Sequence, residues 1–275
     1  MASRWYCTIE SVKAASIGTF TPELDDAIGS YIAAASERVE HEFGRRFIPE
    51  TATKYFPCAE PSVKDGVLYL DSEDLLAVTQ LLSRAQDTPY EIVAGNYFVE
   101  PVNDPPYNRI ELKEAAGVTF DGGTASQRAI AVTGRWGYCE TTRAAGTLVG
   151  ALDLTATEVV LSDGLLVGVG DTLLIDAEQV FIKARTTVPN RVTVQRNVNG
   201  TGAATHSNGA AVLAYVPPAD ISDLVRVTAL QRPQQGRAGW TGQIGGDEDT
   251  QELRTENIGR MWSEARSKYA RLVVA

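Results

Sequence analysis

The sequence predicts an α+β protein, with a helical core built from both chain ends, a β-rich region, and an inserted small all-β barrel or sandwich domain. Three observations predict this class: an amphipathic pattern near the N-terminus, short strand-like segments separated by turn residues, and a second amphipathic pattern near the C-terminus. We expect helices and a β-region over residues 1–145, the inserted β-domain over residues 146–217, and C-terminal helices and a tail over residues 218–275 that complete the core.

The first amphipathic pattern predicts one helix over residues 21–43. Thr21 can cap its first free backbone N–H groups, and Pro22 suits the first helical position because proline has no N–H to leave unpaired. The apolar residues recur at three- and four-residue spacing and so share one face: Leu24, Ile28, Tyr31, Ala35, Val39 and Phe43. Gly44 can adopt the left-handed conformation that ends a helix.

Between this helix and residue 145, short segments alternate or are rich in β-branched and aromatic residues, which predicts strands. We expect them at residues 51–56, 67–70, 77–83, 91–93, 97–100, 109–112 and 129–134. From Thr147 onward the composition shifts to Gly, Val and Thr, and further strands are expected at residues 151–155, 158–161, 172–175, 179–185, 191–195 and 211–215. Pro217 and Pro218 end this second set, which we expect to project outward from the core.

Helical patterns return after residue 218. Asp220 is expected to cap a helix that Pro233 stops, and the Gly-rich polar stretch over residues 234–249 is expected to form a mobile loop. The last helix is expected to start near Thr250. Its apolar residues share one face: Ile258, Met261, Trp262, Ala265, Tyr269 and Leu272.

The composition of the 275-residue chain narrows its class. With 44% hydrophobic and 22% charged residues it is expected to be a soluble globular protein, with no signal peptide and no membrane partner. Its three cysteines lack CxxC spacing and are expected to be free thiols. The net charge of −10 argues against an electrostatic grip on nucleic acid, although an acidic wall would help a channel through which DNA passes.

Catalytic chemistry is not expected. The chain has two histidines, His41 and His206, and lacks the HExxH, GxSxG and Walker motifs, so no metal, no cofactor and no enzyme activity are expected. Asp176 and Glu178 are two residues apart and would share one strand face. Such a pair could act as acid and base in a glycosidase, but a polar strand edge or turn is the favoured interpretation.

The order of several segments carries a resemblance to a known family. The segments are EFGRRF, TKYF, VLYLDSEDLLAVTQL, YFVEPVNDPPYNRIELK and AIAVTGRWGY. In this order, over about residues 10–140 and again over the helical C-terminus, the chain resembles the head-to-tail adaptor (head completion, connector) proteins of tailed bacteriophages. The inserted segments VGDTLLIDAEQVFIK and RVTVQRNVNGTGAATHSNGAAV resemble a small β-module that recurs in phage neck and tail proteins.

The resemblance implies a structural virion protein of the phage neck, assembled in the host cytoplasm. Its subunits would form a ring of about twelve copies between the portal protein and the tail or stopper protein, with a channel that DNA passes through without specific binding. Helices would form the body of the ring, and the C-terminal segment would reach the portal. We expect the partner interface to include Arg45, Arg46, Trp240, Met261, Trp262, Tyr269 and Leu272.

Two other functions stay open from the residues alone. One is a virion protein that binds or cleaves carbohydrate, with Asp176 and Glu178 in its sugar site, although the insert has no Trp and a single Tyr, Tyr215. The other is a non-viral adaptor or scaffold domain. Trp240, between glycine-rich segments, fits either an anchor for a partner's pocket or local packing equally well.

Overall fold

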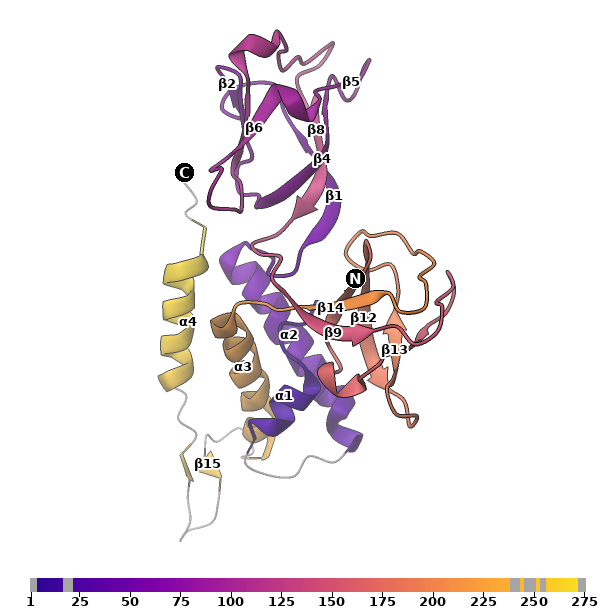
Figure 1. The fold of residues 1–275 in the computed structure, drawn as a ribbon. Helices are drawn as coiled ribbons and strands as arrows, with labels where there is room; N and C mark the ends of the chain where they lie inside the picture. Colours follow the sequence, from indigo (N-terminus) through magenta and orange to yellow (C-terminus); the bar gives the residue numbers. More distant parts are fainter. Residues whose placement is uncertain (1–3, 17–21, 238–242, 245–250, 253–255, 272–275) are drawn as a thin grey trace. The chain divides into compact units, whose positions relative to one another are not determined.

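The computed structural model describes residues 4–16, 22–237, 243–244, 251–252 and 256–271 (Figure 1). The chain divides into two compact units. Unit 1 combines residues 1–44 with residues 141–270, and unit 2 combines residues 45–140 with residues 271–275. Each unit is therefore made from segments that are distant in the sequence.

The predicted α+β class, with a helical core from both chain ends, is wrong. The described residues have more strand than helix, 31% against 26%, and the strands form three larger antiparallel sheets and one two-stranded pair. The physical reason is that each set of strands has its own apolar core. A six-stranded sheet surrounds one core, and two four-stranded sheets share the other. The strands therefore do not depend on helices to bury their apolar faces.

The helices of the described residues all lie in unit 1. They are α1 (Ile9–Ala14), α2 (Asp25–Phe43), α3 (Ala219–Arg237) and α4 (Glu256–Tyr269). The short strands β15 (Gln243–Ile244) and β16 (Gln251–Glu252) pair with each other between α3 and α4. Helix α2 packs on α1, α3 and α4, and α3 also packs on α4 (Figure 1).

The helix ends match the prediction at Gly44 and differ at the other predicted ends. Helix α3 begins at Ala219, so the predicted cap Asp220 lies within the helix. Helix α4 begins at Glu256, whereas a start near Thr250 was predicted. Gly44 ends α2 with a φ of 63°, as its position predicted. The same helix begins at Asp25, after a 3-10 turn η1 (Pro22–Leu24), and the predicted cap Thr21 lies outside the described residues. Helix α3 continues through Pro233, so the predicted stop is wrong. A proline removes one backbone donor and often bends a helix, but it does not always end one.

Unit 2 is built from two four-stranded antiparallel sheets. One has the order β1 (Glu50–Phe56), β8 (Ile130–Trp136), β4 (Leu75–Ser83) and β5 (Tyr90–Glu91). The other has the order β2 (Val63–Lys64), β3 (Val67–Tyr69), β7 (Arg109–Leu112) and β6 (Tyr97–Glu100), with 3-10 turns η2 (Ala94–Asn96) and η3 (Glu114–Ala116) beside it. Both sheets supply the core, which includes Phe56, Leu68, Leu75, Leu81, Ile110, Ile130, Val132 and Trp136.

Six strands of unit 1 form a closed barrel. Their order is β10 (Glu158–Val160), β13 (Arg191–Gln195), β12 (Glu178–Arg185), β11 (Thr172–Ile175), β14 (Ala211–Tyr215) and β9 (Thr142–Thr147). The two outer strands meet where Val149 N donates to Val160 O and Ser162 N donates to Thr147 O, both at 2.9 Å. Closure leaves these two strand ends without a free edge.

The interior of the barrel is apolar. Its side chains are Ala145, Leu148, Leu152, Val159, Leu161, Val167, Leu173, Ile175, Val180, Ile182, Val192, Val194, Val212 and Ala214. On the strands these residues alternate with outward-facing ones, as the period of two requires. The η4 turn (Gly164–Leu166) lies between β10 and β11.

Residues of the N-terminal segment and of α1 contact the barrel. Trp5 packs edge-on against Phe181 of β12, with ring centroids 5.3 Å apart. The Glu10 carboxylate accepts hydrogen bonds from Val169 N and from Arg185 Nε, both at 2.9 Å. The barrel therefore belongs to the same compact unit as the helices.

Gly134 of β8 marks a point where two strands approach too closely for a side chain. A Cβ atom there would lie 2.0 Å from the carbonyl oxygen of Ala77 on β4. Gly95, in η2, has nothing within 4 Å of its Cβ position and serves as a control. We expect Gly134→Ala to lower the free energy of unfolding by about 2 kcal/mol, because the strands must separate to admit the methyl group.

Urea unfolding of both variants tests this expectation. Gly95→Ala should stay within about 0.5 kcal/mol of the parent protein. Equal stability of the Gly134→Ala variant and the parent would mean that β4 and β8 are not in this close register.

Candidate functional site

Two of the residues predicted for the partner interface hold α4 onto the other helices. Trp262 and Tyr269 are buried, and their rings lie 5.8 Å and 6.3 Å from the ring of Phe43 on α2. The Arg38 guanidinium lies 4.1 Å from the centre of the Trp262 ring, a cation–π geometry. Residues of the same chain therefore bury these two side chains.

Asp220, near the start of α3, is the polar partner of α4. Its carboxylate accepts hydrogen bonds from the Tyr269 hydroxyl at 2.7 Å and from Lys268 Nζ at 2.8 Å. Partial burial acts to raise the pKa of Asp220, but the bonds from Lys268 and Tyr269 outweigh it and hold that pKa below its usual range. Burial and the bond to Asp220 together raise the pKa of Tyr269 to about 12. The carboxylate and the phenol are therefore in their ordinary ionisation states at neutral pH.

Met261 lies beside a groove between α3 and α4. The groove has a volume of about 220 Å³ and is lined by Asp220, Asp223, Met261, Glu264, Ala265 and Lys268. Trp240 and Leu272, the other C-terminal residues predicted for the interface, lie outside the described residues. Of the α4 residues predicted for the partner interface, Met261 is the one that lines this open groove.

Arg45 and Arg46 lie in unit 2, where both make ion pairs within the chain. Arg45 Nη1 donates to Asp74 Oδ1 at 2.8 Å, and its guanidinium lies 5.0 Å from the centre of the Tyr138 ring. Arg46 donates to the Glu50 carboxylate at the start of β1. The structure thus gives both arginines a local packing role, and their predicted part in a partner interface stays a prediction.

The carboxylate of Asp220 is expected to set how firmly α4 is held. Asp220→Asn weakens two hydrogen bonds and removes an ion pair, so we expect amide hydrogens of α4 to exchange about fivefold faster or more, with α2 unchanged. Asp223→Asn is the matched control, because exposed Asp223 pairs with Arg226 on the same helix. Hydrogen exchange read by mass spectrometry measures both, and equal exchange in the two variants would contradict this role.

A buried carboxylate closes one end of the barrel. Glu178 begins β12 in phase with the inward-facing residues Val180 and Ile182, and its side chain is 0% exposed. Arg196 donates to it from Nε at 2.7 Å and from Nη2 at 2.6 Å, a bidentate pair. The backbone N–H groups of Asn197 and Ala204 also donate to it, at 3.1 Å and 2.8 Å.

The Arg196 guanidinium also binds the backbone around it. Its remaining donors reach the carbonyl oxygens of Asp153, Ala156 and Ala204, at 2.9 Å, 3.1 Å and 2.6 Å. The network of Glu178 and Arg196 therefore fixes two loops at the same end of the barrel. A buried charge pair is tolerable only when the remaining donors and acceptors are satisfied in this way.

His206 joins Glu178 to the surface. Its Nε2 lies 3.0 Å from Glu178 Oε2, and its Nδ1 lies 2.7 Å from Oδ2 of Asp176. Asp176 is 64% exposed and takes a φ of 52° in the turn between β11 and β12. His41, the other histidine, is exposed on α2.

The sequence analysis singled out two of the four residues of this network. The spacing of Asp176 and Glu178 singled out the pair, but predicted that they share one strand face. In the structure Asp176 lies in a turn and Glu178 points into the barrel. Arg196 and His206 follow 18 and 28 residues after Glu178, and no spacing rule connects them to it.

The Glu178 network makes the stability of the barrel depend on pH. Burial acts to raise the pKa of Glu178, but hydrogen bonds from Arg196, Ala204 N and His206 outweigh it and lower that pKa from 4.5 to about 2. A depressed carboxyl pKa stabilises the fold fully above the unfolded value. The stabilisation is lost as the pH falls from 4.5 through about 2.

We expect Glu178→Gln to lower the free energy of unfolding by about 3 kcal/mol at pH 7, because it leaves Arg196 buried without a counter-charge. The difference from the parent should shrink as the pH falls below 4.5. Glu158→Gln is the control, since Glu158 forms an exposed ion pair with Arg191 on the same barrel. Urea titrations between pH 7 and pH 3 measure it, and a pH-independent difference would contradict the assignment.

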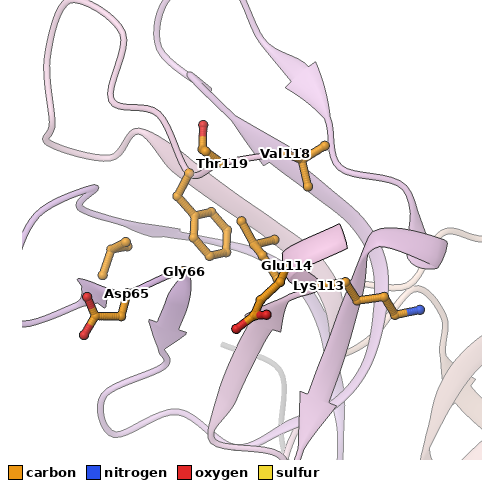
Figure 2. A pocket seen from close by; sticks show the side chains of 9 residues that line it. Asp65, Gly66, Lys113, Glu114, Val118 and Thr119 are labelled. Atoms are coloured by element: carbon orange, nitrogen blue, oxygen red, sulfur yellow. The ribbon is translucent and has the colours of Figure 1, made fainter. Parts of the chain in front are cut away.

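Unit 2 has a pocket beside the turn between β2 and β3 (Figure 2). Its volume is about 270 Å³, and its apolar lining is Val63, Leu112, Val118 and Phe120. Asp65 and Glu114 add carboxylates, while Lys113 extends away from them (Figure 2). Lys113 Nζ donates to Gly95 O at 2.7 Å and lies 4.5 Å from the centre of the Phe98 ring. The charge at this pocket is therefore negative.

Among the described residues, no group of three or more His, Cys, Asp or Glu side chains could hold a metal ion. The three cysteines are free thiols, as expected. In the part of the chain that the structure describes, no helix has the length and apolar character needed to cross a bilayer. A comparison with models of known protein families finds no match, and a search of curated proteins finds none either.

Proposed function

We propose that this chain is the subunit of a ring adaptor in the neck of a tailed bacteriophage. The ring would join the portal protein to the tail or stopper protein, and DNA would pass through its channel without specific binding. It would assemble in the host cytoplasm and remain in the virion. The order of sequence segments that resembles the adaptor family is the basis of the proposal, and the arrangement of α4 supports it.

The attachment of α4 is the single structural observation that carries the proposal. This helix is the last element of the described chain, and its buried residues are Trp262, Ala265 and Tyr269. Three buried side chains, with ion pairs at the exposed edge of the helix, stabilise its attachment only modestly. An end helix held in this way can contribute its outer surface, including the groove at Met261, to a larger partner.

Closed cyclic symmetry gives such a subunit its mechanism. A contact between unlike surfaces of neighbouring copies repeats until the ring closes, provided that the rotation between copies divides a full turn. A net charge of −10 on each subunit would keep a DNA channel from gripping phosphate. The function then follows from geometry, and no chemical step is required.

The carbohydrate alternative receives less support from the barrel. A sugar site there would use Asp176 and Glu178 together. The Glu178 side chain is enclosed at 0% exposure and its oxygens are occupied by Arg196, His206 and two backbone N–H groups. A carboxylate that is fully engaged inside the barrel cannot also bind a sugar hydroxyl. The non-viral scaffold alternative is decided by the portal experiment below.

Removal of the residues after Asp249 is expected to leave a folded monomer that cannot join the portal. Helix α4 lies wholly in the removed segment, so the surface proposed to meet the portal goes with it. Mass photometry of the chain mixed with the portal ring of the same particle measures the added mass. The full-length chain should add a full complement of subunits, and circular dichroism should show that the shortened chain keeps its β-structure.

Two results would overturn the proposal. A shortened chain that binds the portal as the full-length chain does would remove α4 from the interface. A full-length chain that ignores the portal would favour the scaffold or carbohydrate alternatives.

A further inference from the structure

The pocket of unit 2 combines an apolar lining with two carboxylates that have no counter-charge among the described residues. Asp65, from the turn between β2 and β3, and Glu114, from η3, both line it and are both exposed (Figure 2). Within the described part of the chain, neither side chain takes part in an ion pair or a hydrogen bond. At the groove between α3 and α4, by contrast, Asp220, Asp223 and Glu264 each pair with a cation of the same chain.

The two lysines that are next to these carboxylates in the sequence do not neutralise them. Lys113 Nζ donates to Gly95 O at 2.7 Å and lies 4.5 Å from the centre of the Phe98 ring. Val63 lines the pocket, and the alternation of side chains on β2 places Lys64 on the opposite face of the strand. The ammonium groups of both lysines are therefore directed away from the pocket.

Hydrogen bonds fix the walls of the pocket. Leu112 N donates to Gly66 O at 2.9 Å, which joins the turn between β2 and β3 to β7. The Tyr90 hydroxyl donates to the carbonyl oxygen of Thr119, another residue of the lining. Because the walls are already ordered, a ligand that enters the pocket does not have to order them.

Size and charge together select the class of ligand. The volume of about 270 Å³ lies just below the range of about 300–1,000 Å³ that holds drug-sized molecules, so the ligand is small. Methylene groups of a ligand would leave water against the apolar lining, which is Val63, Leu112, Val118 and Phe120. The two carboxylates attract a cation and repel an anion.

We propose that this pocket binds a small organic cation, whose ammonium group faces Asp65 and Glu114 and whose short alkyl chain covers the apolar lining. An ammonium group forms charge-assisted hydrogen bonds with carboxylates, and an alkyl stem beneath a charged head is the way in which lysine side chains cover apolar surface. The inference goes beyond the proposed adaptor function and does not rest on it, because a single chain contains the whole site.

Titration of the full-length chain with hexylammonium, followed by ¹⁵N NMR at low salt, tests the proposal. We expect saturable shifts that are largest at residues 63–66 and 112–120, with a dissociation constant of about 1 mM. Hexanol has nearly the same chain without the charge, and methylammonium has the charge without the chain. Each should bind about tenfold more weakly or worse, because each loses one of the two attractions.

Substitution of the carboxylates locates the ammonium group. Asp65→Asn and Glu114→Gln should each weaken hexylammonium binding about threefold and leave hexanol binding unchanged. Asparagine suits position 65, where φ is 51°, because it tolerates the left-handed region. Glu111→Gln is the matched control: Glu111 is exposed on β7, does not line the pocket and carries the same charge, so hexylammonium should bind this variant as it binds the parent.

Several results would overturn the proposal. Equal affinities for hexylammonium and hexanol would mean that the carboxylates do not select the ligand. A loss of affinity in Glu111→Gln equal to that in Asp65→Asn would mean that only net charge matters. No shift at about 20 mM hexylammonium, or shifts that are largest outside residues 63–66 and 112–120, would remove the site. None of these results bears on portal binding, so the two proposals stand or fall separately.

Discussion

The ion pair between Glu178 and Arg196 is the interaction on which the barrel depends. Strand closure gives the barrel an apolar interior, but it leaves one end where loops must cross without a partner strand. The Glu178 carboxylate binds backbone N–H groups of those loops, and the Arg196 guanidinium binds their carbonyl groups. Each charge thus satisfies the polar backbone that closure exposes, which is why a fully buried pair is stable there.

The same principle organises the rest of unit 1. Glu10 satisfies a backbone N–H of the barrel and pairs with Arg185, and Arg185 in turn binds the η4 turn. The N-terminal segment, the barrel wall and the η4 turn are therefore connected through one carboxylate and one guanidinium.

The structural role that we propose agrees with this distribution of polar groups. In enzymes, perturbed carboxyl groups lie in clefts where a substrate can reach them. Here Glu178, which is bound by Arg196, His206 and two backbone N–H groups, is enclosed, whereas a groove at α4 and a pocket in unit 2 are open at the surface. Open apolar surfaces next to fixed charges are what subunit and partner contacts use.

The sequence by itself determined many of the local elements of this protein, although the strand predicted over residues 151–155 is absent and β9 was not predicted. Five strands have the predicted bounds: β6, β7, β11, β13 and β14. The helix end at Gly44 was also foreseen. These features depend on neighbouring residues, because side-chain alternation and positive-φ turn residues act over a few positions.

Only the tertiary structure decided the fold class and the sites. The sequence predicted a small barrel or sandwich over residues 146–217, but which of the two forms depends on which distant strand edges meet, and no local pattern specifies that pairing. The partners of Glu178, and the side chains that bind the backbone of the η4 turn, likewise belong to residues far along the chain. Loops bring them together, so no periodic pattern connects them.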